Sequence, residues 1–185
     1  MIRELITAVD ALHRVPENGK AEIVDGDVVL MHPTGARPGR AAGKVYASLN
    51  EHEELHGGGY AFGDNVGFLV DLPGRGSFSP DAAWYTGSLG ADEMEFLPGA
   101  PSFALEVRSK NDYGQHAERA IARKIEEYFA AGTQVVWDVD LQSDDLVRVH
   151  RASDPHAAAV YRRGELADAE PAVPGWKMPV DRLFQ

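Results

Sequence analysis

The fold of this chain is decided by one stretch, Phe103-Ala104-Leu105-Glu106-Val107-Arg108-Ser109. The two-residue period of a β-strand puts Glu106 and Arg108 on one face of this stretch and its larger apolar side chains on the other. A carboxylate among apolar neighbours is costly to bury unless a cation, hydrogen bonds or a metal ion compensates its charge. The stretch therefore predicts a strand of the core that carries one functional or firmly paired acid.

A second acid stands in a similar setting, in the run Ser79-Pro80-Asp81 of an apolar segment 25 positions (106 − 81) before Glu106. Two acids on neighbouring strands can share one hard cation through their oxygen atoms, and such a pair is a common part of nuclease sites. Each acid also has an ordinary explanation. Asp81 after Pro80 could mark a turn, and Glu106 could be a structural carboxylate bonded to Arg108 or Lys124.

Turn and helix signals divide the rest of the chain into helices and strands. Asp25-Gly26 favours a tight hairpin turn between Lys20–Val24 and Asp27–Met31, and a capping box at Thr7-Ala8-Val9-Asp10 predicts a short helix before it. Helices are expected at about 39–55 and 115–131, ended by Gly57 and Gly132. The expected later strands are 66–72, 78–85, 102–109, 134–140, 146–151 and 158–161, and the tail should dock Trp176, Leu183 and Phe184. This order predicts an α/β fold with a mixed β-sheet flanked by helices, an N-terminal helix and a β-hairpin.

Length and composition fit a single domain spanning residues 1–185. The 185 residues are 44% hydrophobic and 25% charged, which is typical of globular proteins. The chain has no cysteine, so disulfides, thiolate catalysis and cysteine-based zinc sites are excluded. The N-terminal residues lack the apolar run of a signal peptide, and no stretch approaches the ~20 apolar residues of a membrane span. A cytoplasmic location is therefore expected.

The charge of the chain weighs against one class of function without excluding it. A formal net charge of −11 disfavours broad, unspecific attraction to nucleic acid. Basic residues nevertheless gather at Arg37-Pro38-Gly39-Arg40 with Lys44, and again at Arg119, Arg123 and Lys124. A basic groove on an acidic protein is therefore compatible with the sequence.

Lys124 is placed to reach the two acids. On a helix it lies about 60° from Ile121 and about 20° beyond Ala117, at the border of the apolar stripe. An ammonium there can contact the sheet, where it could orient or help to deprotonate an attacking water and stabilise charge on a phosphate. Arg108 could do only the last of these, because a guanidinium stays protonated. A helix lysine that simply extends its ammonium into water is the ordinary alternative.

Several motifs of the chain follow one another in a characteristic order. They are Glu22-Ile23-Val24-Asp25-Gly26, Pro80-Asp81, Glu106-Val107-Arg108-Ser109, Lys124 followed by Tyr128 and Gly132, Val136-Trp137-Asp138-Val139-Asp140, and Pro174-Gly175-Trp176 before Leu183-Phe184. In their order and spacing they resemble the Uma-two family of predicted restriction endonucleases, a branch of the PD-(D/E)XK nuclease superfamily. The resemblance covers nearly the whole chain.

The resemblance implies a restriction-endonuclease-like fold and a metal-dependent endonuclease that hydrolyses phosphodiester bonds, with DNA as the expected substrate. By analogy it also implies a homodimer. It implies Mg²⁺ or Mn²⁺ held by Asp81, Glu106 and Val107, with Glu22 as an accessory acid unless Glu22 is an ordinary exposed hairpin residue. The superfamily pattern has lysine two positions after Glu106, where this chain has Arg108. Whether Arg108 or Lys124 fills the lysine role stays open.

Two other functions are compatible with the sequence. One is a non-catalytic descendant of the nuclease fold that acts as a binding or assembly module, which the acidic net charge favours. The other is a zinc peptidase, because His52-Glu53-Glu54-Leu55-His56 fits the pattern of two histidines one helical turn apart with a glutamate that activates water. A catalytic zinc needs three protein ligands, however, and no third ligand is visible in the sequence.

Overall fold

The fold is described from a computed structural model, and the described residues are 9–15, 19–90 and 94–185. Residues 9–12 are helical, as the N-terminal prediction requires, whereas Thr7 of the predicted capping box lies outside the described residues. The remaining elements are β1 (Lys20–Val24), β2 (Asp27–Met31), α2 (Ala36–His56), β3 (Tyr60–Phe62), β4 (Phe68–Leu72), β5 (Arg75–Phe78), β6 (Ala82–Tyr85), β7 (Leu97–Pro98), β8 (Phe103–Val107), α3 (Gln115–Ala130), β9 (Val135–Val139), β10 (Val147–Arg151), β11 (Asp154–Tyr161), β12 (Leu166–Asp168), β13 (Lys177–Pro179) and the 3₁₀ helix η1 (Val180–Phe184).

The strands form two larger sheets rather than one. The first has the order β2-β1-β5-β4-β7 and the second the order β11-β10-β9-β8-β6-β3. The second sheet is mixed, because β8 runs parallel to β9 and antiparallel to β6. The single strand predicted at 78–85 is wrong in this respect: it is broken at Ser79-Pro80-Asp81 into β5 and β6, which belong to different sheets. Proline lacks an amide proton for the ladder and fits such a break.

The predicted hairpin is confirmed residue for residue. Strands β1 and β2 pair antiparallel from Lys20 opposite Met31 to Val24 opposite Asp27. The two turn residues both have positive φ angles, 52° at Asp25 and 86° at Gly26. Asp and Gly are among the residues that adopt this conformation at least cost, so the local sequence suffices to fix the register of the hairpin.

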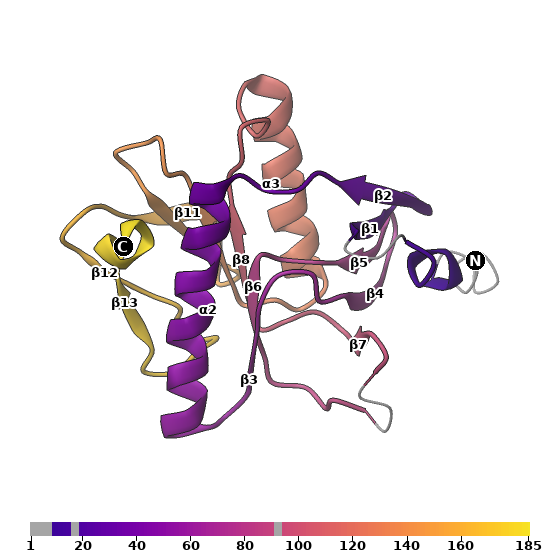
Figure 1. The fold of residues 1–185 in the computed structure, drawn as a ribbon, viewed down its shortest axis with the longest axis horizontal. Helices are drawn as coiled ribbons and strands as arrows, with labels where there is room; N and C mark the ends of the chain where they lie inside the picture. The colour runs from indigo at the N-terminus through magenta and orange to yellow at the C-terminus, as the bar shows by residue number, and fades with distance from the viewer. Residues whose placement is uncertain (1–8, 16–18, 91–93) are drawn as a thin grey trace.

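Helices α2 and α3 cover opposite faces of the second sheet, as the alternation in β8 requires. Phe103, Leu105 and Val107 pack in one cluster with Val45 and Leu49 of α2. Ala104 of the same strand packs on the other face, in a cluster with Ile125 and Tyr128 of α3. Figure 1 shows the two helices on either side of the strands β6 and β8. The prediction of a mixed sheet flanked by helices is therefore confirmed.

The C-terminal tail docks on the α2 side of the second sheet, as predicted. Trp176 is buried against both Phe103 and Trp137, and its indole N–H donates to Ser48 Oγ at 3.1 Å. The sequence did not predict that this tail forms the small β12–β13 sheet and η1. Within the described ranges, neither helix is long and apolar enough to cross a membrane.

Truncation of Leu49 to alanine is expected to lower the free energy of unfolding by about 2–5 kcal/mol, since this side chain is fully buried on the inner face of α2. The matched control is Leu55→Ala, in the last turn of the same helix, where the leucine is 71% exposed. Urea denaturation of both variants gives the comparison. Equal losses in the two variants would contradict the packing described above.

Candidate active site

Asp81 lies immediately before β6, where the chain passes from the first sheet to the second. Its backbone N–H donates to the Leu105 carbonyl oxygen at 2.9 Å. Its carboxylate accepts a hydrogen bond from the backbone N–H of Val107, with 2.8 Å between the nitrogen and Oδ2. The predicted metal ligands Asp81 and Val107 are thus in direct contact, and Glu106 stands between Leu105 and Val107 on β8.

Glu106 is held by two groups from α3. Its Oε1 accepts a hydrogen bond from the Tyr128 hydroxyl at 2.6 Å and lies 2.8 Å from Lys124 Nζ. Burial raises the pKa of the Glu106 carboxyl, and the carboxylates of Asp81 and Glu22 raise it further, outweighing the lowering by Lys124. A carboxylate whose charge is disfavoured in this way gains from an additional cation.

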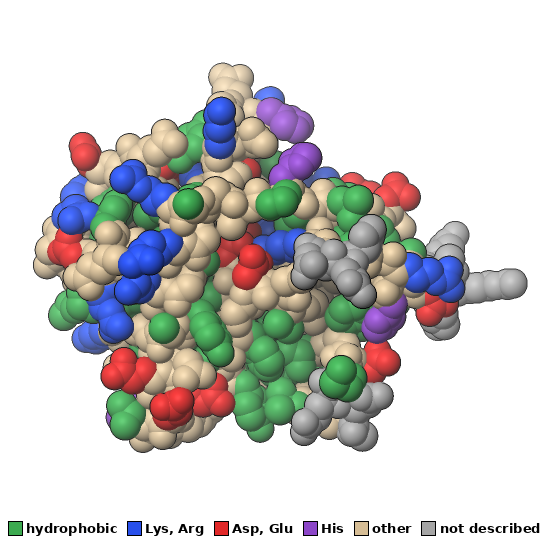
Figure 2. Space-filling view, viewed as in Figure 1, with side chains coloured by type: hydrophobic (Ala, Val, Ile, Leu, Met, Phe, Trp, Pro, Cys, Tyr) green, Lys and Arg blue, Asp and Glu red, His purple; other side chains and the backbone are tan. Residues whose placement is uncertain are grey.

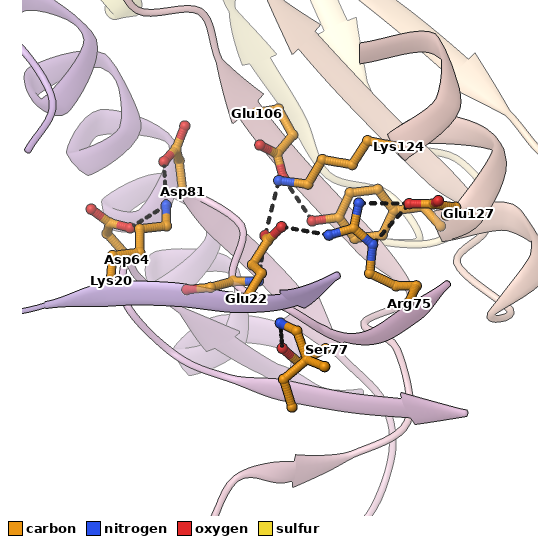
Figure 3. A network of polar contacts seen from close by, with 12 residues as sticks. Lys20, Glu22, Asp64, Arg75, Ser77, Asp81, Glu106, Lys124 and Glu127 are labelled. Atoms are coloured by element: carbon orange, nitrogen blue, oxygen red, sulfur yellow. Dashed lines mark hydrogen bonds and ion pairs between the residues drawn. The ribbon is translucent and has the colours of Figure 1, made fainter. Parts of the chain in front are cut away.

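Lys124 bridges the two glutamates of the site. Its ammonium lies 2.8 Å from Glu106 Oε1 and 3.0 Å from Glu22 Oε1, and its side chain is only 17% exposed (Figure 3). Burial lowers the pKa of Lys124, but the carboxylates of Glu106 and Glu22 raise it by more, so the net shift is upward. The ammonium therefore points into the site, as the helical spacing predicted, and not into open solvent.

Glu22 is among the most buried charged residues of the chain, with 1% of its surface exposed. Besides Lys124, it accepts hydrogen bonds from Arg75 Nη1 at 2.8 Å and from the backbone N–H of Ser79 at 2.9 Å. The alternative of an exposed hairpin residue is therefore wrong. Arg75 in turn contacts Glu127 of α3 at 2.6 Å, so this network ties the first sheet to α3.

Lys20 belongs to the site although sequence reasoning missed it. Its Nζ lies 2.8 Å from Asp81 Oδ1 and 2.7 Å from Asp64 Oδ1. Burial lowers the pKa of Lys20, and the carboxylates of Asp81, Glu106 and Asp64 raise it by more. One signal could have revealed it: Lys20 and Glu22 stand two residues apart on β1 and therefore share a face.

Arg108 is turned away from Glu106 despite sharing its strand face. The guanidinium donates to both carboxylate oxygens of Asp138, at 2.8 and 2.7 Å, and to both of Glu118. Hydrogen bonds to Asp138, with those to Glu118, raise the pKa of Arg108 against the effect of burial. In this arrangement Arg108 fastens the first turn of α3 to β8 and β9. Its predicted part in stabilising charge on a phosphate stays a prediction.

A cavity of about 1020 Å³ opens over these groups. Among the residues that line it are Lys20, Glu22, Asp81, Glu106, Val107 and Lys124. The segment before α2 and the loop before α3 also form part of the wall. The predicted acids and the predicted lysine therefore meet at one cavity.

The carboxylates of Asp81 and Glu106 at the cavity are oxygen donors of the kind that Mg²⁺ uses. Among the described residues, no group of three or more His, Asp or Glu side chains is arranged to hold a metal ion. Mg²⁺ commonly binds through one or two carboxylates, with waters and substrate phosphates completing its shell. The ionised network would carry a formal charge of −2 (4 − 6), from the cations Lys20, Arg75, Arg123 and Lys124 and the carboxylates Glu22, Asp25, Asp64, Asp81, Glu106 and Glu127. A divalent cation would balance that charge.

The histidine pair of α2 lacks the partners of a catalytic zinc site. The His52 and His56 rings lie 4.6 Å apart, but the intervening Glu53 accepts a hydrogen bond from the backbone N–H of Ala61 at 2.6 Å. His52 packs against the edge of Trp84, and burial, followed by the nearby His56, lowers its pKa. With no third ligand among the described side chains, the geometry does not support a zinc peptidase.

A mixed sheet between two helices, with paired acids and a lysine at one cavity, defines the restriction-endonuclease-like class. The sequence pattern of the Uma2 family, described as "Putative restriction endonuclease", matches residues 9–181. The chain therefore belongs to the Uma2 family, and the family resemblance seen in its motifs is confirmed. A crystal structure from Anabaena variabilis, titled as a putative nuclease belonging to DUF820, has a TM-score of 0.74 at 17% identity, over 96% of this chain and 97% of that one. No curated protein matches the chain.

Replacing Tyr128 with phenylalanine is expected to weaken the Mg²⁺ binding that the family resemblance implies by about 10–100-fold, because Tyr128 donates to the Glu106 carboxylate and orients it. Its ring stacks on Phe78 with centroids 4.0 Å apart, and phenylalanine keeps that packing. The matched control is Tyr161→Phe, which removes a hydroxyl bonded to Asp168, away from the cavity. Calorimetric titration of Mg²⁺ into both variants checks the expectation, and unchanged affinity in Tyr128→Phe would contradict it.

Proposed function

We propose that this chain is a Mg²⁺-dependent nuclease that hydrolyses phosphodiester bonds in DNA, with Mn²⁺ able to replace Mg²⁺. One observation carries the proposal: Asp81, from the connection between β5 and β6, and Glu106 of β8 meet Lys124 of α3 at a single large cavity. Membership of a restriction-endonuclease family supports the same reaction class. The proposed ligands are the carboxylates of Asp81 and Glu106 and the backbone carbonyl of Val107.

Each side chain of the site would have its own role in the reaction. Lys124, fixed between Glu106 and Glu22, is placed to orient a water and to neutralise the charge that develops on a phosphate. Tyr128 holds the Glu106 carboxylate, and Lys20 holds that of Asp81. Bound Mg²⁺ would supply the Lewis acidity that polarises a phosphoryl oxygen and lowers the pKa of a water.

Cleavage assays test the proposal on three substrates: supercoiled plasmid, single-stranded DNA and single-stranded RNA. The purified protein is incubated with each in Mg²⁺, in Mn²⁺ or in excess chelator, and light scattering of the protein alone tests the homodimer that the family resemblance implies. DNA cleavage that needs the metal is the expected result.

A protein that cleaves none of the three substrates in either metal would contradict the proposal. That result would favour the non-catalytic binding module instead. One observation is compatible with the module: each of the two acids already has a lysine partner, Lys20 for Asp81 and Lys124 for Glu106.

A further inference from the structure

The charges of α2 are segregated along its length. Its N-terminal half carries the basic residues Arg37, Arg40 and Lys44, and its C-terminal half carries Glu51, Glu53 and Glu54. Figure 2 shows the same division on this face of the molecule, where Lys and Arg gather over the upper part of α2 and the C-terminal segment and acids gather near the lower end of α2. In a chain with a net charge of −11, such a basic area is exceptional.

The three basic residues of α2 share one side of the helix. At 100° per residue, Lys44 lies about 20° and Arg40 about 60° from Arg37 around the helix axis, and the three span about 10 Å along it. Arg37 and Arg40 are exposed and Lys44 is half-exposed. Arg40 also donates to the Gln185 carbonyl oxygen at 2.8 Å, which places η1 with its Arg182 beside this side of α2. We call Arg37, Arg40, Lys44 and Arg182 the α2 basic strip.

The side chains of this strip have few internal partners. Within the described part of the chain, Arg37, Lys44 and Arg182 form no side-chain hydrogen bond or ion pair, and Arg40 bonds only to a backbone oxygen. By contrast, the neighbouring basic residues Arg162 and Arg163 are each 2.6 Å from an aspartate, Asp145 and Asp181 respectively. Cations that the fold leaves unpaired remain available to an external anion.

The α2 basic strip reaches the rim of the catalytic cavity. Arg37 lines the cavity together with Thr34, Gly35 and Pro38. Asp81 and Glu106 line the same cavity. Only the N-terminal end of the strip, at Arg37, touches the cavity, so a linear polyanion lying along the strip would enter the cavity around the N-terminus of α2. This continuity favours a nucleic acid over an acidic protein, because only a chain of phosphodiesters offers both the regular negative charge and the bond that the site is suited to cleave.

We propose that the α2 basic strip binds the sugar-phosphate backbone of the nucleic acid and guides it into the catalytic cavity. The identity of the bound polyanion rests on the proposed function, whereas the binding surface does not. The strip explains how a protein of acidic net charge holds a polyanion: the attraction is confined to one side of α2 and η1 and does not need a basic surface overall.

The test measures binding separately from cleavage. Fluorescence anisotropy of a labelled single-stranded DNA and of the corresponding duplex is recorded in excess chelator over a range of salt concentrations, for wild type and for Arg40→Gln/Lys44→Gln. Arg37 is left intact because it lines the cavity. The matched control is Arg14→Gln/Lys177→Gln, which removes two exposed charges outside the strip.

The strip variant is expected to bind about tenfold more weakly than wild type. Its slope of log affinity against log salt should be smaller by about 1.4–1.8, the value for two lost phosphate contacts. The control should match wild type in both respects. Equal affinity and slope in the strip variant and the control would overturn the proposal, and so would a wild-type protein that binds neither DNA.

Cleavage followed in parallel with Mg²⁺ separates this proposal from the proposed function. Strip-dependent binding without cleavage in wild type would refute the nuclease and leave the binding surface standing. Cleavage with strip-independent binding would refute the strip alone. An acidic polypeptide that competes as well as DNA for the strip would overturn the assignment to nucleic acid.

Discussion

Glu106→Gln is expected to reduce DNA cleavage by about a thousandfold or more, equivalent to at least about 4 kcal/mol of transition-state stabilisation. Glutamine preserves the shape of the side chain and can still accept the Tyr128 hydrogen bond at 2.6 Å. It removes the negative charge, however, that a bound cation and Lys124 both require. The loss should therefore appear in the rate and in Mg²⁺ affinity, with the fold retained.

The matched control for this prediction is Glu54→Gln, an exposed position near the end of α2, whose carboxylate oxygen accepts from Asn50. Its cleavage rate should equal that of wild type. Circular dichroism spectra establish that both variants are folded. Cleavage by Glu106→Gln at the wild-type rate would contradict the assigned site, even if the protein is a nuclease.

Arg75→Met is expected to lower the free energy of unfolding by about 3–5 kcal/mol, because it removes one partner of a buried ion-pair network. The Arg75 side chain is 7% exposed and joins Glu22, whose side chain is 2% exposed, to Glu127. Lys124 and Arg123 remain as partners of the two glutamates, but the link between the first sheet and α3 is lost.

A surface ion pair provides the comparison for Arg75→Met. Arg162 contacts Asp145 at 2.6 Å, yet its side chain is 57% exposed, so Arg162→Met should cost less than about 1 kcal/mol. Chemical denaturation of both variants at neutral pH gives the two values. A loss for Arg75→Met no larger than that for Arg162→Met would show that the buried network does not hold the two parts together.

The elements that the sequence predicted well are those set by local chemistry. The β1–β2 hairpin follows from Asp25-Gly26, and α2 and α3 follow from apolar residues at helical spacing and from glycines after the last turn. Gly57 and Gly132 both have positive φ angles, 62° and 104°. Such signals lie within a few residues of the structure that they specify, and this is why they can be read without the rest of the fold.

The arrangement of the strands into sheets was not predicted, because it depends on pairing between segments that are far apart in the sequence. The strand predicted at 78–85 contains all of β6 but only Phe78 of β5, and nothing in the polar run at residues 75–77 predicted that it forms a strand of the other sheet. Pro80 was the one local signal of the break. The short strands β12 and β13 have three residues each, too few to show a period, and depend on packing against the α2 side of the core.

The same distinction holds within the candidate site. Asp81, Glu106 and Lys124 could be singled out because each is a charged residue in an apolar setting or at the border of an apolar stripe. Lys20 and Arg75 were missed because their partners are far away in sequence: Lys20 bonds to Asp81 across 61 positions and Arg75 to Glu22 across 53. Only the assembled fold shows that the network keeps a net negative charge.

Calorimetric titration of Mg²⁺ into wild type and into Asp81→Asn tests most directly the claim that Asp81 and Glu106 form a cation site. Asparagine keeps an oxygen that can accept the Val107 N–H bond but lacks the charge that pairs with a metal. One saturable site is expected in wild type, and none is expected in Asp81→Asn. Saturable binding that is identical in the two proteins, or no saturable binding in wild type, would contradict the claim.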